Sequence, residues 1–238
     1  LQMIDSTKSL TEFNQQLSDW FSLGVILPFE FEVLPDLNDS RKNSLFISIP
    51  YTLLPSMSYY GTEYGNQLLS RYLSMATKVL MMFGKSETEA RNIANQAIEF
   101  DNILVNYSKN SEEDYYPVPI GEFTSVIRNI NFPSIFNILY SSNPQNNYIT
   151  MSNSAYFERM DSFINESNFE KMKSWILVET LCTFKDFLTE DYRQVVSEYN
   201  LAYSGIPKMR SREDNAYIVT KNTFPDIVGN YYGEKYFD

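Results

Sequence analysis

The residue types that perform most protein chemistry are almost missing from this chain. Its 238 residues include no histidine and one cysteine, Cys182. Without imidazole the chain cannot build a Ser-His-Asp triad, a Cys-His pair or a histidine-ligated zinc site. Cys182 lies in an apolar run, where we expect an inert buried thiol, and a single cysteine excludes an intramolecular disulfide. We therefore predict no catalytic, cofactor-binding or metal-binding residue within residues 1–238.

Carboxylates are the remaining candidates for chemistry. Glu30 and Glu32 are spaced i, i+2 on one face of an expected strand and could act as a carboxylate pair, but we prefer a solvated strand face. The segment DLNDS, residues 36–40, resembles the start of a calcium-binding loop. Arg41 and Ile47 occupy the positions where that loop needs glycine and glutamate, so we reject a calcium site.

The net charge limits the possible partners. The chain has 30 acidic and 19 basic residues, a formal charge of −11, which repels phosphate backbones and anionic membrane surfaces. We therefore predict no nucleic-acid partner, and no apolar run reaches the ~18 residues of a membrane span. The acidic run 112–114 and the basic cluster 208–212 are interpreted as solvated loops. The compartment stays open between cytoplasmic and cell-surface or secreted bacterial.

Hydrophobic periodicity predicts a mainly α-helical domain with a small antiparallel β-hairpin near the N-terminus. Apolar residues alternate at 29–33 and 45–49, with turn-forming residues between them. Residues 169–187 are apolar nearly all round, which predicts the most buried helix. Ser86 and Glu89 form a capping box that opens a long helix. Further helices are expected at 10–24, 65–84, 121–130, 133–141, 154–165, 189–205 and 224–238, an extended piece at 146–153, and loops at 111–119 and 207–215.

One segment fits neither a helix nor a strand, although it is rich in apolar side chains. It reads IPYTLLPSMSYYG and covers residues 49–61. Pro50 and Pro55 fix φ and remove two backbone donors, which excludes a regular element. We expect an apolar connector that packs onto the helical domain through Leu53, Leu54 and the tyrosines.

The last expected helix has features that suit contact with another element. Gly229 and Gly233 are four residues apart and share a face, where another element can approach closely. Apolar side chains, among them Ile227 and Tyr231, give the helix an apolar face that suits packing against another element. Packing within the same domain is one interpretation. The other is that the helix leads into a further part of the protein, because the chain stops at Asp238 directly after an aromatic helix.

Two sequence blocks resemble the neprilysin-type zinc endopeptidases. The first covers residues 23–60, in which Pro-Phe precedes a strand, an Asp-x-x-Asp-Ser turn follows, and a second strand leads to Leu-Pro-x-x-x-Tyr-Tyr. The second covers residues 226–237. The matching residues are Gly24, Pro28, Phe29, Asp36, Asp39, Ser40, Leu54, Pro55, Tyr59 and Tyr60, then Val228, Gly229, Tyr232, Tyr236 and Phe237. The bacterial oligopeptidase O branch is the most similar in character, because no cysteine follows the Tyr-Tyr pair; Asn230 replaces a common arginine.

The resemblance implies that residues 1–238 form the helical N-terminal, substrate-gating domain of a neprilysin-like peptidase, truncated at both ends. The zinc site of that family, a His-Glu-x-x-His helix with a downstream glutamate, belongs to a catalytic domain absent from this chain. The parent would be a zinc metalloendopeptidase whose peptide substrates are hydrolysed in that other domain. This chain alone would be inactive and would shape the substrate chamber. The alternative is a stand-alone acidic helical protein-binding module.

Overall fold

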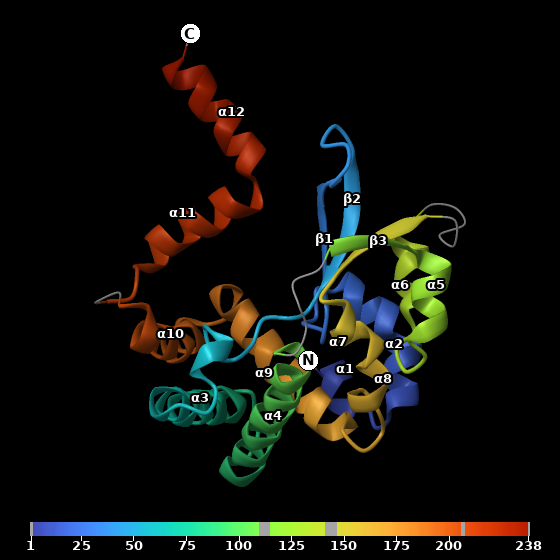
Figure 1. Ribbon diagram of the computed structural model, residues 1–238. Helices are drawn as coiled ribbons and strands as arrows, with labels where there is room; N and C mark the ends of the chain where they lie inside the picture. Colours follow the sequence, from blue (N-terminus) through green and yellow to red (C-terminus); the bar gives the residue numbers. More distant parts are fainter. Residues whose placement is uncertain (1, 110–114, 141–146, 206–207, 238) are drawn as a thin grey trace.

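A computed structural model describes residues 2–109, 115–140, 147–205 and 208–237. Figure 1 shows three parts: a small sheet with short helices around it, a group of long helices beside it, and two C-terminal helices that extend away from both. The mainly helical fold predicted from periodicity is confirmed. Within the described residues, no helix is long and apolar enough to cross a bilayer.

The sheet contains the predicted hairpin and two further strands. Its strand order is β1-β2-β4-β3, in which β2 and β4 are parallel and the two outer pairs are antiparallel. The hairpin and the extended piece at 146–153 are confirmed as β1, β2 and β4. The loop predicted at 111–119 is wrong from Tyr115 onward, because this segment pairs with β4 as strand β3. The strands are β1 (Glu30–Pro35), β2 (Asn43–Ser48), β3 (Tyr115–Pro119) and β4 (Tyr148–Ser152).

Short helices surround the sheet and share an aromatic core with it. Phe29 and Phe31 from the first strand region contact Phe132, and Phe31 also contacts Phe136. Phe123 joins the group through Phe132 and Phe136, and the ring centroids of these pairs are 4.7 to 6.4 Å apart. Such edge and tilted contacts add to the large apolar area that aromatic rings bury. The helices of this half are α1 (Gln2–Ser6), α2 (Leu10–Ser22), α5 (Ile120–Val126), α6 (Phe132–Leu139), α7 (Ser154–Glu158) and α8 (Met160–Phe163).

Four long helices form the second half, which we call the helical bundle. The capping box of Ser86 and Glu89 is present at the start of α4, as predicted. Helix α9 is buried on five consecutive residues, Ser174–Val178, which confirms the prediction of the most buried helix in this segment. The bundle helices are α3 (Glu63–Met82), α4 (Glu87–Ser108), α9 (Phe169–Thr183) and α10 (Glu190–Ser204), and the 3-10 turn η3 (Phe184–Phe187) joins the last two.

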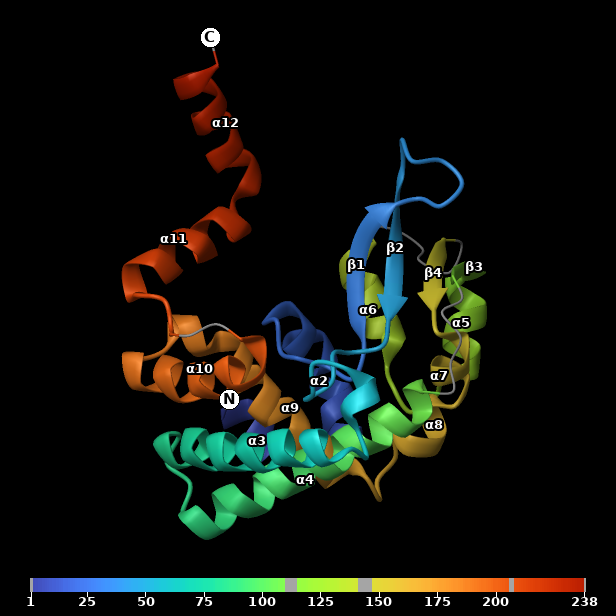
Figure 2. The same ribbon diagram turned by 60° about the vertical axis from the view of Figure 1, so that its left-hand side comes forward.

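The two C-terminal helices, α11 (Arg212–Thr223) and α12 (Pro225–Tyr236), form an arm that contains no buried residue. Figures 1 and 2 show that it extends away from the bundle beyond α10. The loop predicted at 207–215 is wrong from Arg212 onward. Ser211 caps α11 by accepting a hydrogen bond from the Asp214 N–H, a signal present in the sequence although α11 has no apolar periodicity.

Gly65 gives a test of how tightly α3 packs on the turn before it. A Cβ at Gly65 would lie 2.0 Å from the Tyr59 carbonyl oxygen, whereas one at Gly229, also helical, would meet nothing within 4 Å. We expect Gly65→Ala to lower the free energy of unfolding by about 1–3 kcal/mol or more through overpacking. Gly229→Ala should raise it by up to ~1 kcal/mol through helix propensity. Urea denaturation followed by circular dichroism measures both, and equal effects would contradict the packing.

Candidate functional site

The carboxylates considered from sequence do not assemble into a catalytic pair. Glu30 is half-buried, which raises its pKa, and it accepts a hydrogen bond from the Tyr51 N–H at 3.4 Å, while Glu32 is exposed. Asp36 accepts hydrogen bonds from the backbone N–H groups of Asn38 and Asp39, at 2.8 and 3.0 Å. It therefore organises the hairpin turn. Among the residues that the structure describes, no group of three or more histidines, cysteines or acids is arranged to hold a metal.

Cys182 has the environment of a structural thiol. Its side chain packs in the bundle with Sγ 3.7 Å from the Met75 sulfur. Burial and the nearby Glu179 carboxyl raise the pKa of the thiol well above its ordinary value. A protonated, shielded thiol is a poor nucleophile, in line with the interpretation made from sequence.

The connector between β2 and α3 buries the middle of its irregular backbone. Leu53 is 6% exposed and Leu54 1%, and both pack against the helical bundle, as predicted. Buried backbone groups are costly unless they are hydrogen-bonded, and no strand or helix supplies partners here. Side chains supply them instead, so this segment depends on specific residues elsewhere in the chain.

Side chains bind all four backbone polar groups of the Leu-Leu pair. The Leu53 N–H donates to Asp101 Oδ1 at 3.0 Å, and the Leu53 carbonyl accepts from the Tyr199 hydroxyl at 2.8 Å. The Leu54 N–H donates to the Tyr60 hydroxyl oxygen at 3.1 Å, and the Leu54 carbonyl accepts from Thr52 Oγ1 at 2.9 Å.

Prolines remove the neighbouring donors, because neither Pro50 nor Pro55 has an N–H. The Tyr60 hydroxyl then donates to the second oxygen of Asp101, which closes the network. We call Tyr60, Asp101, Tyr199 and the Leu53–Leu54 backbone the connector cluster. The two prolines and Tyr60, the second residue of the Tyr-Tyr pair, thus contribute to the burial of an irregular backbone.

A second buried carboxyl lies deeper in the bundle. Glu179 on α9 accepts a hydrogen bond from the Tyr72 hydroxyl of α3 at 2.8 Å, and the Tyr72 ring contacts Tyr199 with centroids 5.5 Å apart. Burial raises the pKa of Glu179 to about 7, and Asp101 adds to the rise. The sequence analysis did not identify Asp101 or Glu179, since an acid within an apolar helical stripe is the only local signal of such a group.

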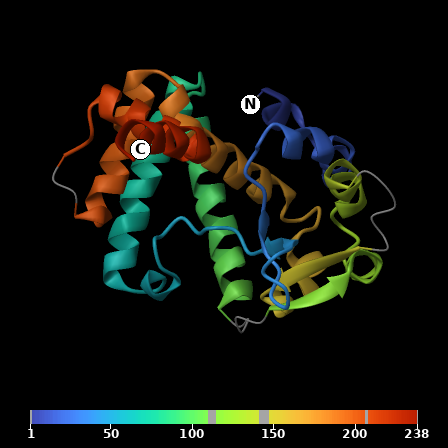
Figure 3. The same cartoon turned by 90° about the horizontal axis from the view of Figure 1, so that it is seen from above.

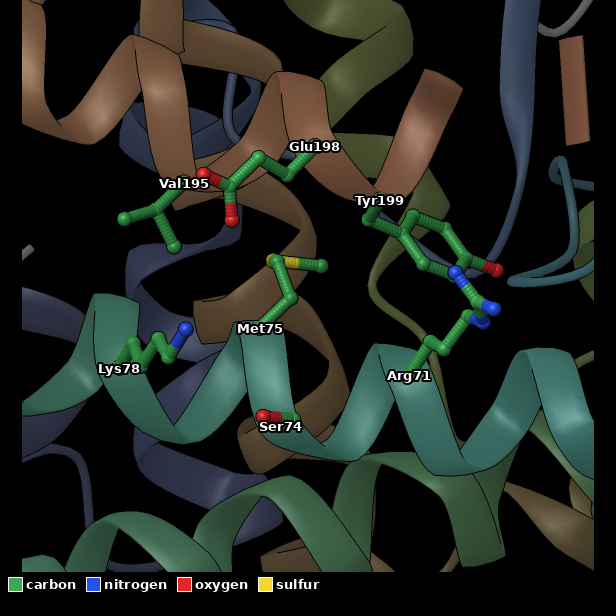
Figure 4. A pocket seen from close by; sticks show the side chains of 7 residues that line it. All are labelled: Arg71, Ser74, Met75, Lys78, Val195, Glu198 and Tyr199. Atoms are coloured by element: carbon green, nitrogen blue, oxygen red, sulfur yellow. The ribbon is translucent and has the colours of Figure 1, made fainter. Parts of the chain in front are cut away.

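An open groove between α3 and α10 lies beside this cluster and has a volume of about 170 Å³. Figure 4 shows Arg71 beside Tyr199 at one end, and Lys78 with the Glu198 carboxylate at the other, around Met75. Charges of both signs at an open groove suit contact with a polar chain. The groove lining contains no histidine or cysteine, and no metal-ligand set is found among the described residues.

The arm presents the other distinctive surface. On α12, Ile227 is 67% exposed and Tyr231 64%. At 100° per residue they share one side, while Asp226 and Asn230 form a polar stripe next to it. No added Cβ at Gly229 or Gly233 would meet an atom within 4 Å, so packing of these glycines within the described structure, one of our two interpretations, is wrong.

A family model decides what these features belong to, because the N-terminal model of peptidase family M13 matches residues 1–238, the whole chain. The chain belongs to peptidase family M13. This confirms the neprilysin-type resemblance drawn from residues 23–60 and 226–237.

The M13 relatives are longer than this chain. A neutral endopeptidase of Lactococcus lactis subsp. cremoris is 29% identical over the whole chain, which covers 39% of that protein. A putative zinc metalloproteinase of Streptococcus gordonii is 23% identical over 98% of the chain and 43% of its own length. The chain therefore spans about two fifths of the curated relatives that it matches.

Solved structures share the fold. PepO from Lactobacillus rhamnosis HN001 superposes over the whole chain with a TM-score of 0.88 at 22% identity, and the match covers 39% of PepO. The zinc metalloprotease Zmp1 of Mycobacterium tuberculosis, in an open state, superposes over the whole chain with a TM-score of 0.86 at 19% identity, and the match covers 38% of Zmp1. Both confirm the helical N-terminal architecture.

The Tyr199 hydroxyl gives a test of the connector cluster in this M13 chain. Tyr199→Phe leaves the Leu53 carbonyl buried without its partner, so we expect the free energy of unfolding to fall by about 1–3 kcal/mol. Tyr203→Phe on the same helix removes only a half-buried bond to Asn200 and should cost less than ~1 kcal/mol. Chemical denaturation measures both, and equal losses would mean that the Leu53 carbonyl does not depend on Tyr199.

Proposed function

We propose that this chain is the non-catalytic N-terminal domain of a zinc metalloendopeptidase that hydrolyses peptides. In this role it shapes the substrate chamber and restricts access to an active site carried by another part of the protein. Zinc and its ligands belong to that other part, and peptide substrates meet it there. Membership of family M13 over the whole chain carries the proposal.

The composition supports a division of labour within the parent protein. The relatives carry names of endopeptidases and zinc metalloproteinases, and this chain covers about two fifths of their length. A zinc peptidase needs histidine or a comparable ligand set, and this chain has no histidine. Its contribution to peptide hydrolysis would then be shape.

The arm supports a packed neighbour. A helix with one broad apolar side and a polar stripe buries the apolar side against another element in most proteins. Here Phe224, Ile227 and Tyr231 on that side are all exposed. We assign this side to the catalytic part of the same protein.

A stand-alone acidic protein-binding module is the second candidate, and the exposed arm also favours it. In that case a different protein would cover the aromatic side of α12. The two functions differ in what the reading frame encodes after Asp238 and in whether the product hydrolyses peptides.

Zinc content and peptide hydrolysis test the proposal. The reading frame is expressed to its natural stop codon, and residues 1–238 are expressed separately. We expect the longer product to hold one zinc per chain and to cleave a quenched fluorescent peptide until a chelator is added. Residues 1–238 should do neither. A stop codon at 238, or tight zinc with matching turnover in the short chain, would refute it.

The arm has its own test in the longer product. Ile227→Asp places a charge in the apolar side of α12 and should weaken packing of the two parts, which lowers the unfolding midpoint and the rate of peptide cleavage. Asn230→Asp adds the same charge to the polar stripe and should leave both nearly unchanged. Differential scanning calorimetry and the peptide assay are the measurements, and two equivalent variants would exclude this interface.

A further inference from the structure

The attachment of the connector to the bundle depends on one ionisable side chain. Asp101 is 0% exposed, and its carboxyl binds both the Leu53 N–H and the Tyr60 hydroxyl. It hydrogen-bonds to the Leu-Leu backbone from α4, whereas Tyr199 does so from α10. The protonation of this carboxyl therefore affects a contact between the connector, which leads from the sheet, and the bundle.

The surroundings give the carboxyl hydrogen bonds but no ionic partner. Among the described residues, Tyr60 and the Leu53 N–H hydrogen-bond to Asp101, and the buried Trp175 indole N–H lies near it without making a hydrogen bond; none of these groups carries a positive charge. Lys109 lies 5.7 Å from the centre of the Tyr60 ring, on the connector side. Titratable and charged groups lie around the cluster on every element packed against it. The connector contributes Tyr60, α3 contributes Tyr72, and Lys109 follows α4. Helix α9 contributes Glu179 and Cys182, η3 contributes Lys185, and α10 contributes Tyr199 and Tyr203.

Burial raises the pKa of Asp101 to about 7, and the hydrogen bonds from Tyr60 and Leu53 offset only part of that rise. If the connector lifts away, water reaches the carboxyl and its pKa returns toward the ordinary value of 3.8. The closed form thus holds a proton that the open form releases between about pH 4 and pH 7. Opening becomes easier as the pH rises through this window and levels off above it.

We propose that Asp101 is a proton-operated latch: its neutral carboxyl ties residues 52–60 to the helical bundle, and its ionised carboxyl loosens them. Tyr60 and Tyr199 position the backbone that the latch holds. Because the connector is the direct link from β2 to α3, a loosened connector lets the sheet and the bundle move relative to each other. Figure 2 shows the connector crossing from the foot of β2 to the bundle.

Hydrogen exchange of the Leu53 and Leu54 amides tests the latch in the whole chain. Protection is measured from pH 4.5 to 8.5 and corrected for the intrinsic exchange rate. We expect at least a tenfold loss of protection between pH 5 and pH 7 and a plateau above it. Amides of Ile176–Val178 in α9 should be better protected at every pH, and their protection should fall more steeply over the same window, because opening of the bundle also exposes Glu179, whose pKa is raised by burial as well. If connector and α9 amides show the same protection and slope, they open together by global unfolding, and the latch is wrong.

Three variants separate the carboxyl from its structural neighbours. Asp101→Asn cannot ionise and should abolish the pH dependence. Tyr60→Phe withdraws a donor that lowers the pKa of Asp101, so the plateau should move to higher pH. Glu179→Gln, which does not contact the connector, should keep the loss of protection.

The outcomes are distinct even if one variant folds poorly. The wild-type profile and the Tyr60→Phe shift test the latch without Asp101→Asn. A flat wild-type profile, an unmoved plateau in Tyr60→Phe, or an unchanged slope in a folded Asp101→Asn would each overturn it. Tyr199→Phe, which removes a neutral partner of the same backbone, should lower protection equally at every pH.

Discussion

A backbone cannot leave water without partners for its polar groups, and this constraint organises the molecule around residues 49–62. Two leucines there are buried without regular structure, so each of their N–H and carbonyl groups binds a side chain. Those side chains come from α4, from α10 and from the connector itself, which fixes how the sheet half meets the bundle. Of the residues that made the segment look irregular, Tyr60 supplies one of these partners and the prolines lack an N–H that would need one.

Local sequence patterns correctly predicted the helices and strands that form because of residues near one another in the chain. Apolar spacing located α2, α3 and α4, and the nearly uniform apolar character of 169–187 identified the central helix. Strand β3 was missed because its prolines suggest a loop and its pairing partner lies far along the chain. Helix α11 was missed because it buries no side and so has no periodic signal. The connector cluster joins residues 53, 60, 101 and 199, and sequence alone cannot bring these positions together.

Three surface and packing features distinguish the described part of this M13 chain. Its charged groove, its apolar arm and its tightly held connector are all means of contact or of relative placement. Figure 3, seen from above, shows the bundle and the sheet half as separate masses joined through the centre, with the arm over the bundle.

The parallel pairing of β2 with β4 sets an order on how the chain can assemble during synthesis. Strand β4 lies between β2 and β3 in the sheet but is the last of the four to leave the ribosome. The β1–β2 hairpin must therefore wait, with one edge open, until both α3 and α4 have been made. These two helices contact each other locally and can pair early, since contacts between neighbours in sequence form faster than distant ones. The α3–α4 pair would then form before the sheet closes, and α9 and α10, which follow β4 in the chain, complete the bundle afterwards.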